Sequence, residues 1–288
     1  MIEQQVGREG GPRLPHELAG ANFGLDHLTV VDATPSELVK VAGATGFSAV
    51  CLFMESMAAL PRMPQFSLHD SPEAKRELRT ILVGSGVRLD VAYPFTLSRR
   101  SEPDDFRRGL ECAAFLGARF ANALVYDREP ERRLEQFASF CALADEFELG
   151  VVLEFFPRSA VRSLAEGLDL VTSVQRPHEV GLNVDLLHLM RSGGSVQELC
   201  AAPPDYILFG QLCDGLLECE VASRDHEASI QRLQPGRGEF DVKGFHDALP
   251  THCPVSLEIP QESSIRAGAS LHSRARTALD AARCTLEG

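Results

Sequence analysis

The chain has 288 residues, of which 44% are hydrophobic, and this is ample for a large buried core. Its formal net charge at pH 7 is −13, from 28 basic and 41 acidic residues. Proteins that bind a nucleic-acid backbone do so through clustered Lys and Arg, and no such tract occurs in this sequence. The composition therefore argues against a nucleic-acid partner.

Neither a membrane segment nor an export signal is expected. No run of about 18 apolar residues occurs. Residues 1–20 are polar and rich in Gly and Pro, without the apolar stretch of a secretory signal, and we interpret them as a flexible arm. The eight Cys include no CxxC pair, which favours core thiols in a reducing cytosol. We expect a cytoplasmic protein whose folded domain is residues 21–288.

Strand-like and helix-like segments alternate from about residue 25 to the end of the chain. Short apolar runs predict strands at 25–31, 47–54, 87–93, 119–125, 150–155, 180–185, 206–212 and 254–259. The segments between them predict helices at 35–44, 71–84, 103–116, 130–147, 161–174, 187–201, 241–248 and 270–286. Ser71 and Pro72 are expected to start the second helix, as N-cap and first helical residue.

The predicted strands are continuously apolar, which is typical of a parallel sheet covered on both faces. Eight strands alternating with eight helices predict an α/β fold, a single closed (β/α)₈ barrel. An open doubly wound sheet is the rival, but the first strand is not followed by a Gly-rich phosphate loop. In the barrel, the active site is expected at the C-terminal ends of the strands, where two long loops, 60–67 and 214–239, would also lie.

Four predicted strands each end on a residue with an oxygen ligand. These residues are Glu154, Asp185, Gln211 and Glu258. A single polar strand end often means only that the strand meets solvent there. Four strand ends in the same register indicate a shared site, because the C-terminal ends of parallel barrel strands converge. Carboxylate and amide oxygens form a hard ligand set, which suits Mg²⁺ or Mn²⁺.

Other polar residues near these strand ends are candidates for binding substrate. His188 follows Asp185 at the start of the next helix and could lean over the site, although such a residue is often an ordinary surface or capping residue. Asp214 begins the long loop 214–239. His27 in the first strand could point into the barrel mouth or be structural. The Pro-Gly-Arg-Gly-Glu turn at 235–239 could approach a ligand or be a plain loop.

Taken together, these motifs resemble the xylose-isomerase-like TIM-barrel superfamily, and more narrowly its sugar phosphate isomerase/epimerase group. That group also includes ketose 3-epimerases, hydroxypyruvate isomerases, inosose dehydratases and 3-dehydroshikimate dehydratases. The resemblance covers roughly residues 25–259, and its motifs are concentrated after residue 150. It is specific for the superfamily and says little about the substrate.

The resemblance implies one divalent metal ion, Mn²⁺, Mg²⁺ or Co²⁺, held by Glu154, Asp185, Gln211 and Glu258. It also implies that Glu154 and Glu258 move protons, with His188 as a further catalytic residue. His188 and Arg237 would contact substrate oxygens, and Asp214 and His27 are further candidate contacts.

The chain departs from the family pattern at three positions. The third metal ligand is commonly His where this chain has Gln211, as some dehydroshikimate dehydratases do. An acidic residue is more usual at the position of Arg237. One dehydratase branch uses a His where this chain has Phe156, which argues against that version of the mechanism.

A metal that chelates a substrate carbonyl and the adjacent hydroxyl acts as a Lewis acid and stabilises an enediolate. Returning the proton to the opposite face gives epimerisation, and returning it to the neighbouring carbon gives isomerisation. Expelling a β-hydroxyl gives dehydration. Our leading hypothesis is a metal-dependent isomerase or epimerase of a small sugar or keto-polyol. The alternative is a lyase, a dehydratase of the 3-dehydroshikimate or inosose type.

Two other functions fit the sequence less well. An apurinic-site endonuclease on the same barrel needs more His ligands and a basic face. A barrel that only binds a ligand would not need the four-ligand set. We therefore expect a small polyhydroxylated substrate as partner and, since large barrels often pair, a homo-oligomer.

Overall fold

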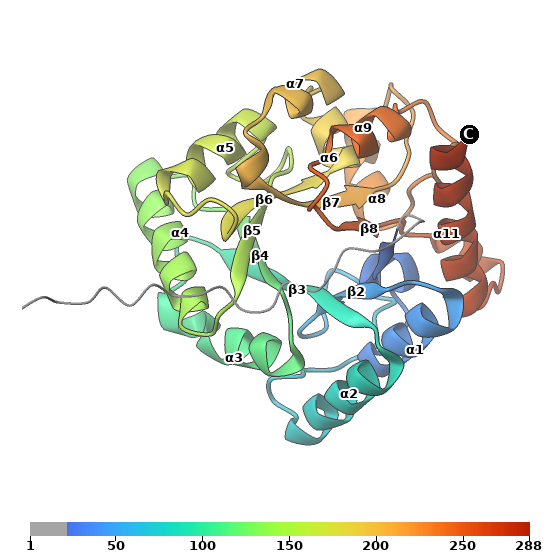
Figure 1. Cartoon of the computed structure of the whole chain (residues 1–288), viewed down its shortest axis with the longest axis horizontal. Coiled ribbons are helices and arrows are strands. Elements are labelled where there is room, and N and C mark those ends of the chain that lie inside the picture. The colour runs from blue at the N-terminus through green and yellow to red at the C-terminus, as the bar shows by residue number, and fades with distance from the viewer. Residues whose placement is uncertain (1–21) are drawn as a thin grey trace, which may run out of the picture.

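The computed structural model describes residues 22–288 and shows eight parallel strands closed into a barrel, with helices around it (Figure 1). The predicted (β/α)₈ barrel is confirmed. The arm predicted at 1–20 lies outside the described residues. The strands are β1 Phe23–Asp26, β2 Ala49–Phe53, β3 Arg88–Leu97, β4 Phe120–Val125, β5 Gly150–Glu154, β6 Val180–Asp185, β7 Ile207–Leu212 and β8 Val255–Leu257.

Helices on the outside of the barrel follow most of the strands. The α-helices are α1 Pro35–Thr45, α2 Pro72–Ser85, α3 Arg107–Leu116, α4 Pro130–Asp145, α5 Leu164–Ser173, α6 Leu186–Arg191, α7 Val196–Ala201, α8 Arg224–Ser229, α9 Val242–Ala248, α10 Glu262–Arg266 and α11 Leu271–Glu287. Short 3₁₀ helices are η1 His27–Val30, η2 Pro103–Phe106, η3 Pro204–Tyr206 and η4 Val221–Ser223. None of the helices in residues 22–288 is both long and apolar enough to cross a membrane.

The barrel closes because β1 pairs in parallel with both β2 and β8. Gly24 of β1 lies opposite Ala49 on one side and opposite Ser256 on the other. Every other strand pairs with its neighbours in sequence, also in parallel. All eight strands therefore end on the same side of the barrel, and their C-terminal residues face one mouth.

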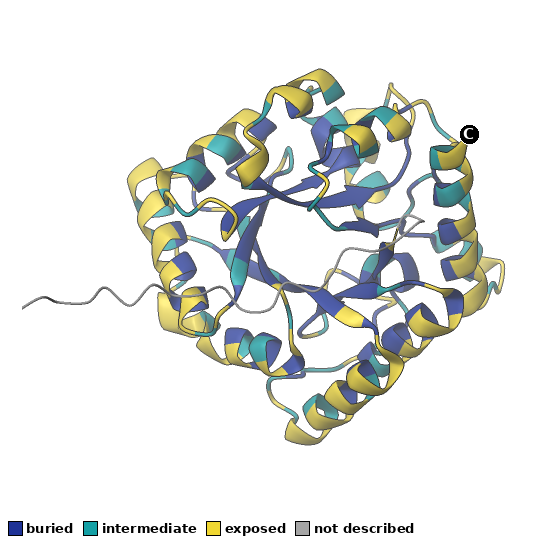
Figure 2. Cartoon of the chain, viewed as in Figure 1, coloured by how far each residue is buried: buried dark blue, intermediate teal, exposed yellow. Residues whose placement is uncertain are grey.

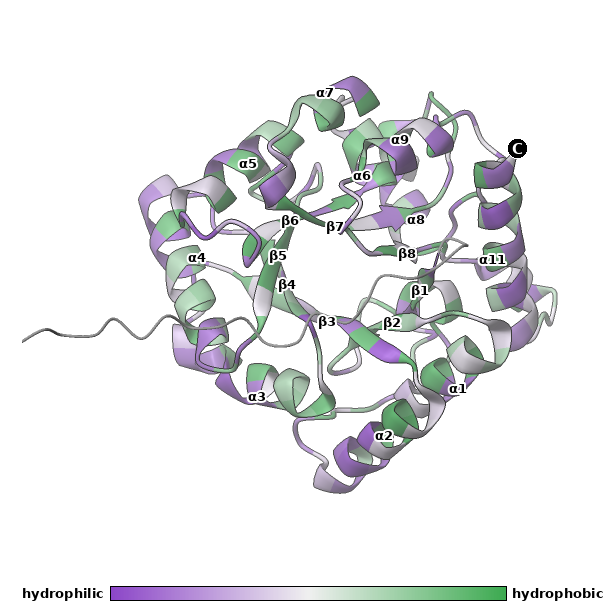
Figure 3. Cartoon of the chain, viewed as in Figure 1, coloured by the Kyte–Doolittle hydropathy of each residue, from purple (hydrophilic) through white to green (hydrophobic). Residues whose placement is uncertain are grey.

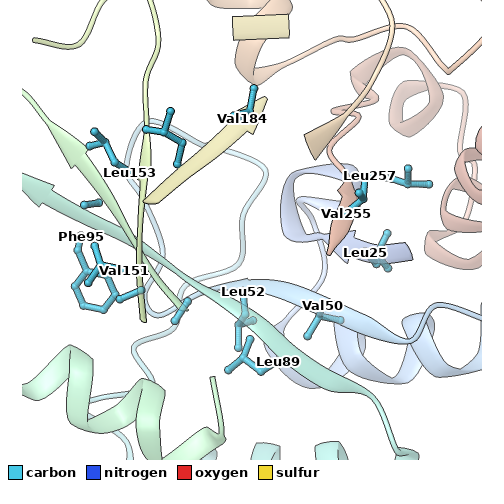
Figure 4. Packing of buried hydrophobic residues seen from close by; sticks show 14 of the residues in the cluster. Leu25, Val50, Leu52, Leu89, Phe95, Val151, Leu153, Val184, Val255 and Leu257 are labelled. Atoms are coloured by element: carbon cyan, nitrogen blue, oxygen red, sulfur yellow. The ribbon is translucent and has the colours of Figure 1, made fainter. Parts of the chain in front are cut away.

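Side chains of successive strand residues pack alternately outside and inside the barrel. Val50 and Leu52 of β2 belong to the large cluster beneath the helices, where Leu52 lies beside Leu89 of β3 (Figure 4). Cys51 and Phe53, the alternate residues of β2, belong to the smaller inner cluster. The strands are accordingly buried, while the helices expose their outer faces (Figure 2). The hydropathy of the helices follows the same division, with apolar residues turned towards the strands (Figure 3).

Local sequence signals set several of the helix boundaries. The Ser71 side chain accepts a hydrogen bond from the Ala74 N–H, and Pro72 is the first residue of α2, so the predicted start of this helix is confirmed. Thr34 and Glu37 form a reciprocal capping box at the start of α1. Such caps satisfy N–H groups that have no partner inside the helix.

The structure corrects the first predicted strand and one of the predicted helices before the long loop. The first strand ends at Asp26, because the Asp26 side chain accepts the Leu28 N–H and turns the chain into η1. The helix predicted at 187–201 is two helices, α6 and α7. Gly193 lies between them with a φ of 80°, a left-handed conformation that disfavours residues with a side chain.

The long segment 214–239, predicted to be a loop, contains η4 and α8. One isolated bridge, between Asp214 and Leu233, closes the segment on itself, and a second, between Gln231 and Gln261, ties it to the chain that follows β8. The segment therefore packs at the mouth of the barrel and forms one wall of the cavity described next.

Candidate active site

A cavity of about 780 Å³ opens at the C-terminal mouth of the barrel. One part of its wall is apolar and comes from Leu28, Phe53, Met57, Tyr93 and Leu124. The polar side chains of Glu154, His188, Arg232 and Glu258 also line the cavity. A mainly apolar cavity with a few convergent polar groups is the usual form of a small-molecule site.

Glu154 ends β5 and is held from two directions. Asn122 of β4 donates its Nδ2–H to Glu154 Oε2 at 2.7 Å, and His188 Nε2 lies 3.5 Å from Glu154 Oε1. His188 stands at the start of α6, and its ring packs on Phe156 with 5.3 Å between ring centroids. Glu154 and His188 thus form an acid–base pair in the cavity wall.

The guanidinium of Arg232 lies between two of the strand-end carboxylates. Its Nη1 is 2.6 Å from Asp185 Oδ2 and its Nη2 is 2.6 Å from Glu258 Oε1, with only 1% of the Arg232 side chain exposed. Burial works against the charged form, but the two carboxylates outweigh it and hold the pKa of Arg232 well above its ordinary value. Arg232 is therefore a fixed positive charge at the centre of the site.

The two carboxylates that share Arg232 differ in their pKa. Burial, together with the like charges of Asp26, Asp185 and Glu154, raises the pKa of Glu258 well above its ordinary value despite Arg232. Burial also acts on Asp185, but there Arg232 and His188 prevail and lower the pKa. The pKa values of the two carboxyls that share Arg232 are thus shifted in opposite directions.

A chain of three amide side chains crosses the barrel beneath the cavity. Asn122 donates to Glu154, and the Nδ2 of Asn183 donates to Asn122 Oδ1 at 3.3 Å and to Gln211 Oε1 at 2.6 Å. Gln211 then donates its Nε2–H to Glu258. Because Asn183 donates to both of its neighbours, Gln211 accepts from it with Oε1, and the network fixes Gln211 with its nitrogen, not its oxygen, towards Glu258.

Asp26 is a fourth strand-end carboxyl that the sequence analysis did not select. It is fully buried at the end of β1, accepts a hydrogen bond from the Tyr93 hydroxyl at 2.7 Å, and lies 3.3 Å from Gln211 Nε2. Burial raises the pKa of Asp26 to about 7, although the Tyr93 and Leu28 hydrogen bonds oppose the rise. The same sequence signal, a carboxylate closing an apolar strand, could have identified it.

The four predicted metal ligands lie at one rim, but as placed they do not fit a metal ion. Both oxygens of Asp185 accept N–H groups, from the His188 backbone at 3.0 Å and from Arg232. Both oxygens of Glu258 are likewise taken, by Arg232 and Gln211. In the described chain, residues 22–288, no group of three or more His, Cys, Asp or Glu is placed to hold a metal. The cation between these carboxylates is a guanidinium.

Among the predicted substrate contacts, His188 lines the cavity and His27 does not. His27 is fully buried in η1, where its Nε2 lies 2.9 Å from the Ala33 carbonyl and its Nδ1 lies 3.4 Å from the Phe53 N–H. Burial lowers the pKa of His27 to about 4, so the ring stays neutral. His27 therefore braces the backbone at the end of the first strand.

Asp214 and Arg237 also lie outside the cavity lining. Asp214 is buried and accepts N–H groups from Gly215, Gly238 and Phe240, so it holds the two ends of the segment together. Arg237 is exposed in the neighbouring turn. Gly236 in that turn has a φ of 75° and lies over Thr285 of α11, which places the turn on the outside of the barrel. The substrate contact expected from Arg237 is not supported; Arg232 is the arginine of this segment that reaches the centre.

The chain belongs to the xylose isomerase-like TIM barrel family, whose model matches residues 39–284. A search of curated protein sequences finds no match.

Solved structures share the fold at low sequence identity. The IolI protein, solved with a binding zinc atom, is 17% identical with a TM-score of 0.72, over 92% of this chain and 98% of that one. D-psicose 3-epimerase, solved in the presence of D-fructose, is 15% identical with a TM-score of 0.69, over 93% and 100%. The probable 3-DHS dehydratase AsbF from Bacillus anthracis is 15% identical with a TM-score of 0.65, over 92% and 97%.

Proposed function

We propose that the chain is an isomerase or epimerase of a small polyhydroxylated carbonyl compound, acting by proton transfer at the barrel mouth. One observation carries the proposal: two carboxyl groups, Glu154 and Glu258, line the same cavity, each beside a different polar partner. Glu154 stands next to His188, and Glu258 next to Arg232. Two carboxyl groups in different environments can divide the removal and the return of a proton between them.

Arg232 supplies the charge that such a proton transfer requires. Removing a proton next to a carbonyl leaves negative charge on the carbonyl oxygen, which a fixed cation stabilises. The Nη2 of Arg232 has a second hydrogen besides the one given to Glu258, and Arg232 lines the cavity. A substrate oxygen bound there would be polarised by a group that is already in position.

The second candidate function is a lyase, and His188 favours it. A dehydratase must protonate the departing hydroxyl, and the His188 ring beside Glu154 could give that proton. The two functions share the first step, removal of a proton next to the carbonyl. They differ afterwards, because the lyase expels the β-hydroxyl group as water and the isomerase or epimerase retains it.

The divalent ion expected at Glu154, Asp185, Gln211 and Glu258 stays a prediction. To hold it, Arg232 must move away and Gln211 must turn its oxygen inward. No step above is assigned to it. A homo-oligomer also stays a prediction.

The test is a panel of ketoses, keto-polyols and their acids incubated with the protein in D₂O. An isomerase or epimerase places deuterium on the carbon next to the carbonyl, which NMR detects in recovered substrate or product. A lyase gives an unsaturated product that absorbs in the ultraviolet. Deuterium incorporation that persists in both Glu154→Gln and Glu258→Gln would contradict the proposed roles of the carboxyl groups.

A further inference from the structure

Four arginines line the cavity, although the protein as a whole is strongly acidic. Arg232 lies at the bottom, between the two carboxylates described above. The others stand nearer the opening, on the loop after β5, on α6 and at the start of α8. They are Arg158, Arg191 and Arg224.

Two of these three outer arginines are neutralised by acidic side chains. Arg158 pairs with Asp225. Arg191 gives Nε and Nη2 to the two oxygens of Glu227, each at 2.6 Å, and its Nη2 also donates to the Leu216 carbonyl at 2.7 Å. Neither guanidinium needs a further charged partner.

Arg224 differs from the other three. Across residues 22–288 no carboxylate lies within ion-pair distance of its guanidinium, whose one hydrogen bond is a 3.5 Å contact from Nη1 to the Arg191 carbonyl. Its Nε is buried without an acceptor, and the residue as a whole is half-buried. A buried donor without an acceptor is costly, so this side chain is poised for an acceptor that a ligand would bring.

We propose that Arg224 binds an anionic group of the substrate, a carboxylate or a phosphate. The planar guanidinium presents paired N–H groups that match the oxygens of either anion. The reacting carbonyl then lies at Arg232 and Glu258, at the bottom of the same cavity. The substrate class becomes a polyhydroxylated keto acid or a sugar phosphate rather than a neutral sugar. Only the assignment of the reacting end rests on the proposed function.

Three probes with the same polyol chain test the anion site without requiring turnover. D-sorbitol carries no charge, D-gluconate carries a carboxylate and D-sorbitol 6-phosphate carries a phosphate. Isothermal titration calorimetry should show one or both anions binding at least about tenfold more tightly than sorbitol, the lower range for a charged hydrogen-bonding partner. Preference for only one anion identifies which group the site takes.

The variants assign the preference to one side chain. Arg224→Gln should abolish the anion preference, and Arg224→Lys should keep part of it, because the charge stays while the paired N–H groups are lost. Arg276→Gln, an exposed arginine of α11, makes the same change in net charge and should keep the preference. Unchanged circular dichroism and melting temperature establish that each variant is folded.

Equal affinity for the three probes, absence of binding by all three, or an anion preference that survives Arg224→Gln overturns the proposal. These outcomes are independent of the deuterium exchange experiment. An anion preference without deuterium exchange would refute the proposed reaction and support the Arg224 site. Deuterium exchange without an anion preference would support the reaction and refute the site.

Discussion

The two halves of the barrel mouth differ in character. Strands β5 to β8 bring polar groups to the rim, Glu154, Asp185, Gln211 and Glu258, with Arg232 between them. Strands β2 to β4 contribute mainly the apolar wall formed by Phe53, Tyr93 and Leu124. Under the proposed function, the polar half carries out the proton transfer and the apolar half sets the shape of the cavity, so substitutions in the two halves should affect different kinetic constants.

The largest effect is expected at Glu258. Glu258→Gln keeps the size of the side chain but cannot move a proton, and kcat should fall by about 10²- to 10⁴-fold, the usual contribution of such a group. Phe53→Leu in the other half should raise KM and leave kcat nearly unchanged. Steady-state kinetics on a substrate found in the D₂O panel measures both. If Phe53→Leu lowers kcat as much as Glu258→Gln does, the two halves of the mouth do not have the separate roles proposed here.

The next effect concerns stability and metal binding together. Arg232→Met leaves Asp185 and Glu258 buried without their cation, which should cost roughly 3–5 kcal/mol in the free energy of unfolding. The freed oxygens should then bind Mn²⁺ more tightly than the wild-type protein does.

Urea unfolding and calorimetric titration with Mn²⁺ measure these two changes. Arg237→Met is the matched control in the same segment, and it should alter neither quantity because Arg237 is exposed. If Arg232→Met instead weakens Mn²⁺ binding, the Arg232 side chain helps the protein to bind the metal ion and does not compete with it.

His188→Ala should lower kcat by about 10²-fold, the lower end of the range for a group that gives or takes a proton. The melting temperature should change little, since the ring lies in the cavity wall, where it packs on Phe156. If kcat is intact, His188 takes no part in the proton transfer.

An effect of pH on stability is expected from His27, which is buried behind the apolar wall of the mouth. Its pKa is about 4 in the folded protein and about 6.5 when exposed, so below pH 6.5 the unfolded chain binds a proton that the folded chain does not. Stability should fall as the pH drops from about 6.5 to about 4, by on the order of 3 kcal/mol in all. Urea unfolding at several pH values should show a smaller drop for His27→Gln. An equal drop would show that His27 is accessible to protons in the folded state.

The sequence predicted those features that depend on local pattern. Apolar runs and their spacing indicated eight strands, and the closed barrel then brought Glu154, Asp185 and Glu258 to one rim because parallel strands end together. The N-cap at Ser71 was equally local. These predictions needed no knowledge of which side chains meet.

The remaining features depend on contacts between distant segments. Arg232 and Arg237 lie five residues apart in the same segment, and no local signal distinguishes the one that reaches the centre from the exposed one. The Gly236 turn over α11 directs Arg237 outward, and the bridge from Gln231 to Gln261 draws Arg232 inward. Asn122 and Asn183 were missed for the same reason. The role of an amide inside a strand cannot be inferred until its hydrogen-bond partners on the neighbouring strands are known.

Through the amide chain, Asn183 sets the orientation of the Gln211 side chain. Asn183 stands at the middle of the chain and donates to both of its neighbours, Asn122 and Gln211. A carboxylate at position 183 has no hydrogens to give, so Gln211 would reverse to supply one and would swing its oxygen to the opposite side. A substitution at position 183, which does not line the cavity, would therefore change the group that Gln211 presents to Glu258 from an N–H donor to an oxygen acceptor.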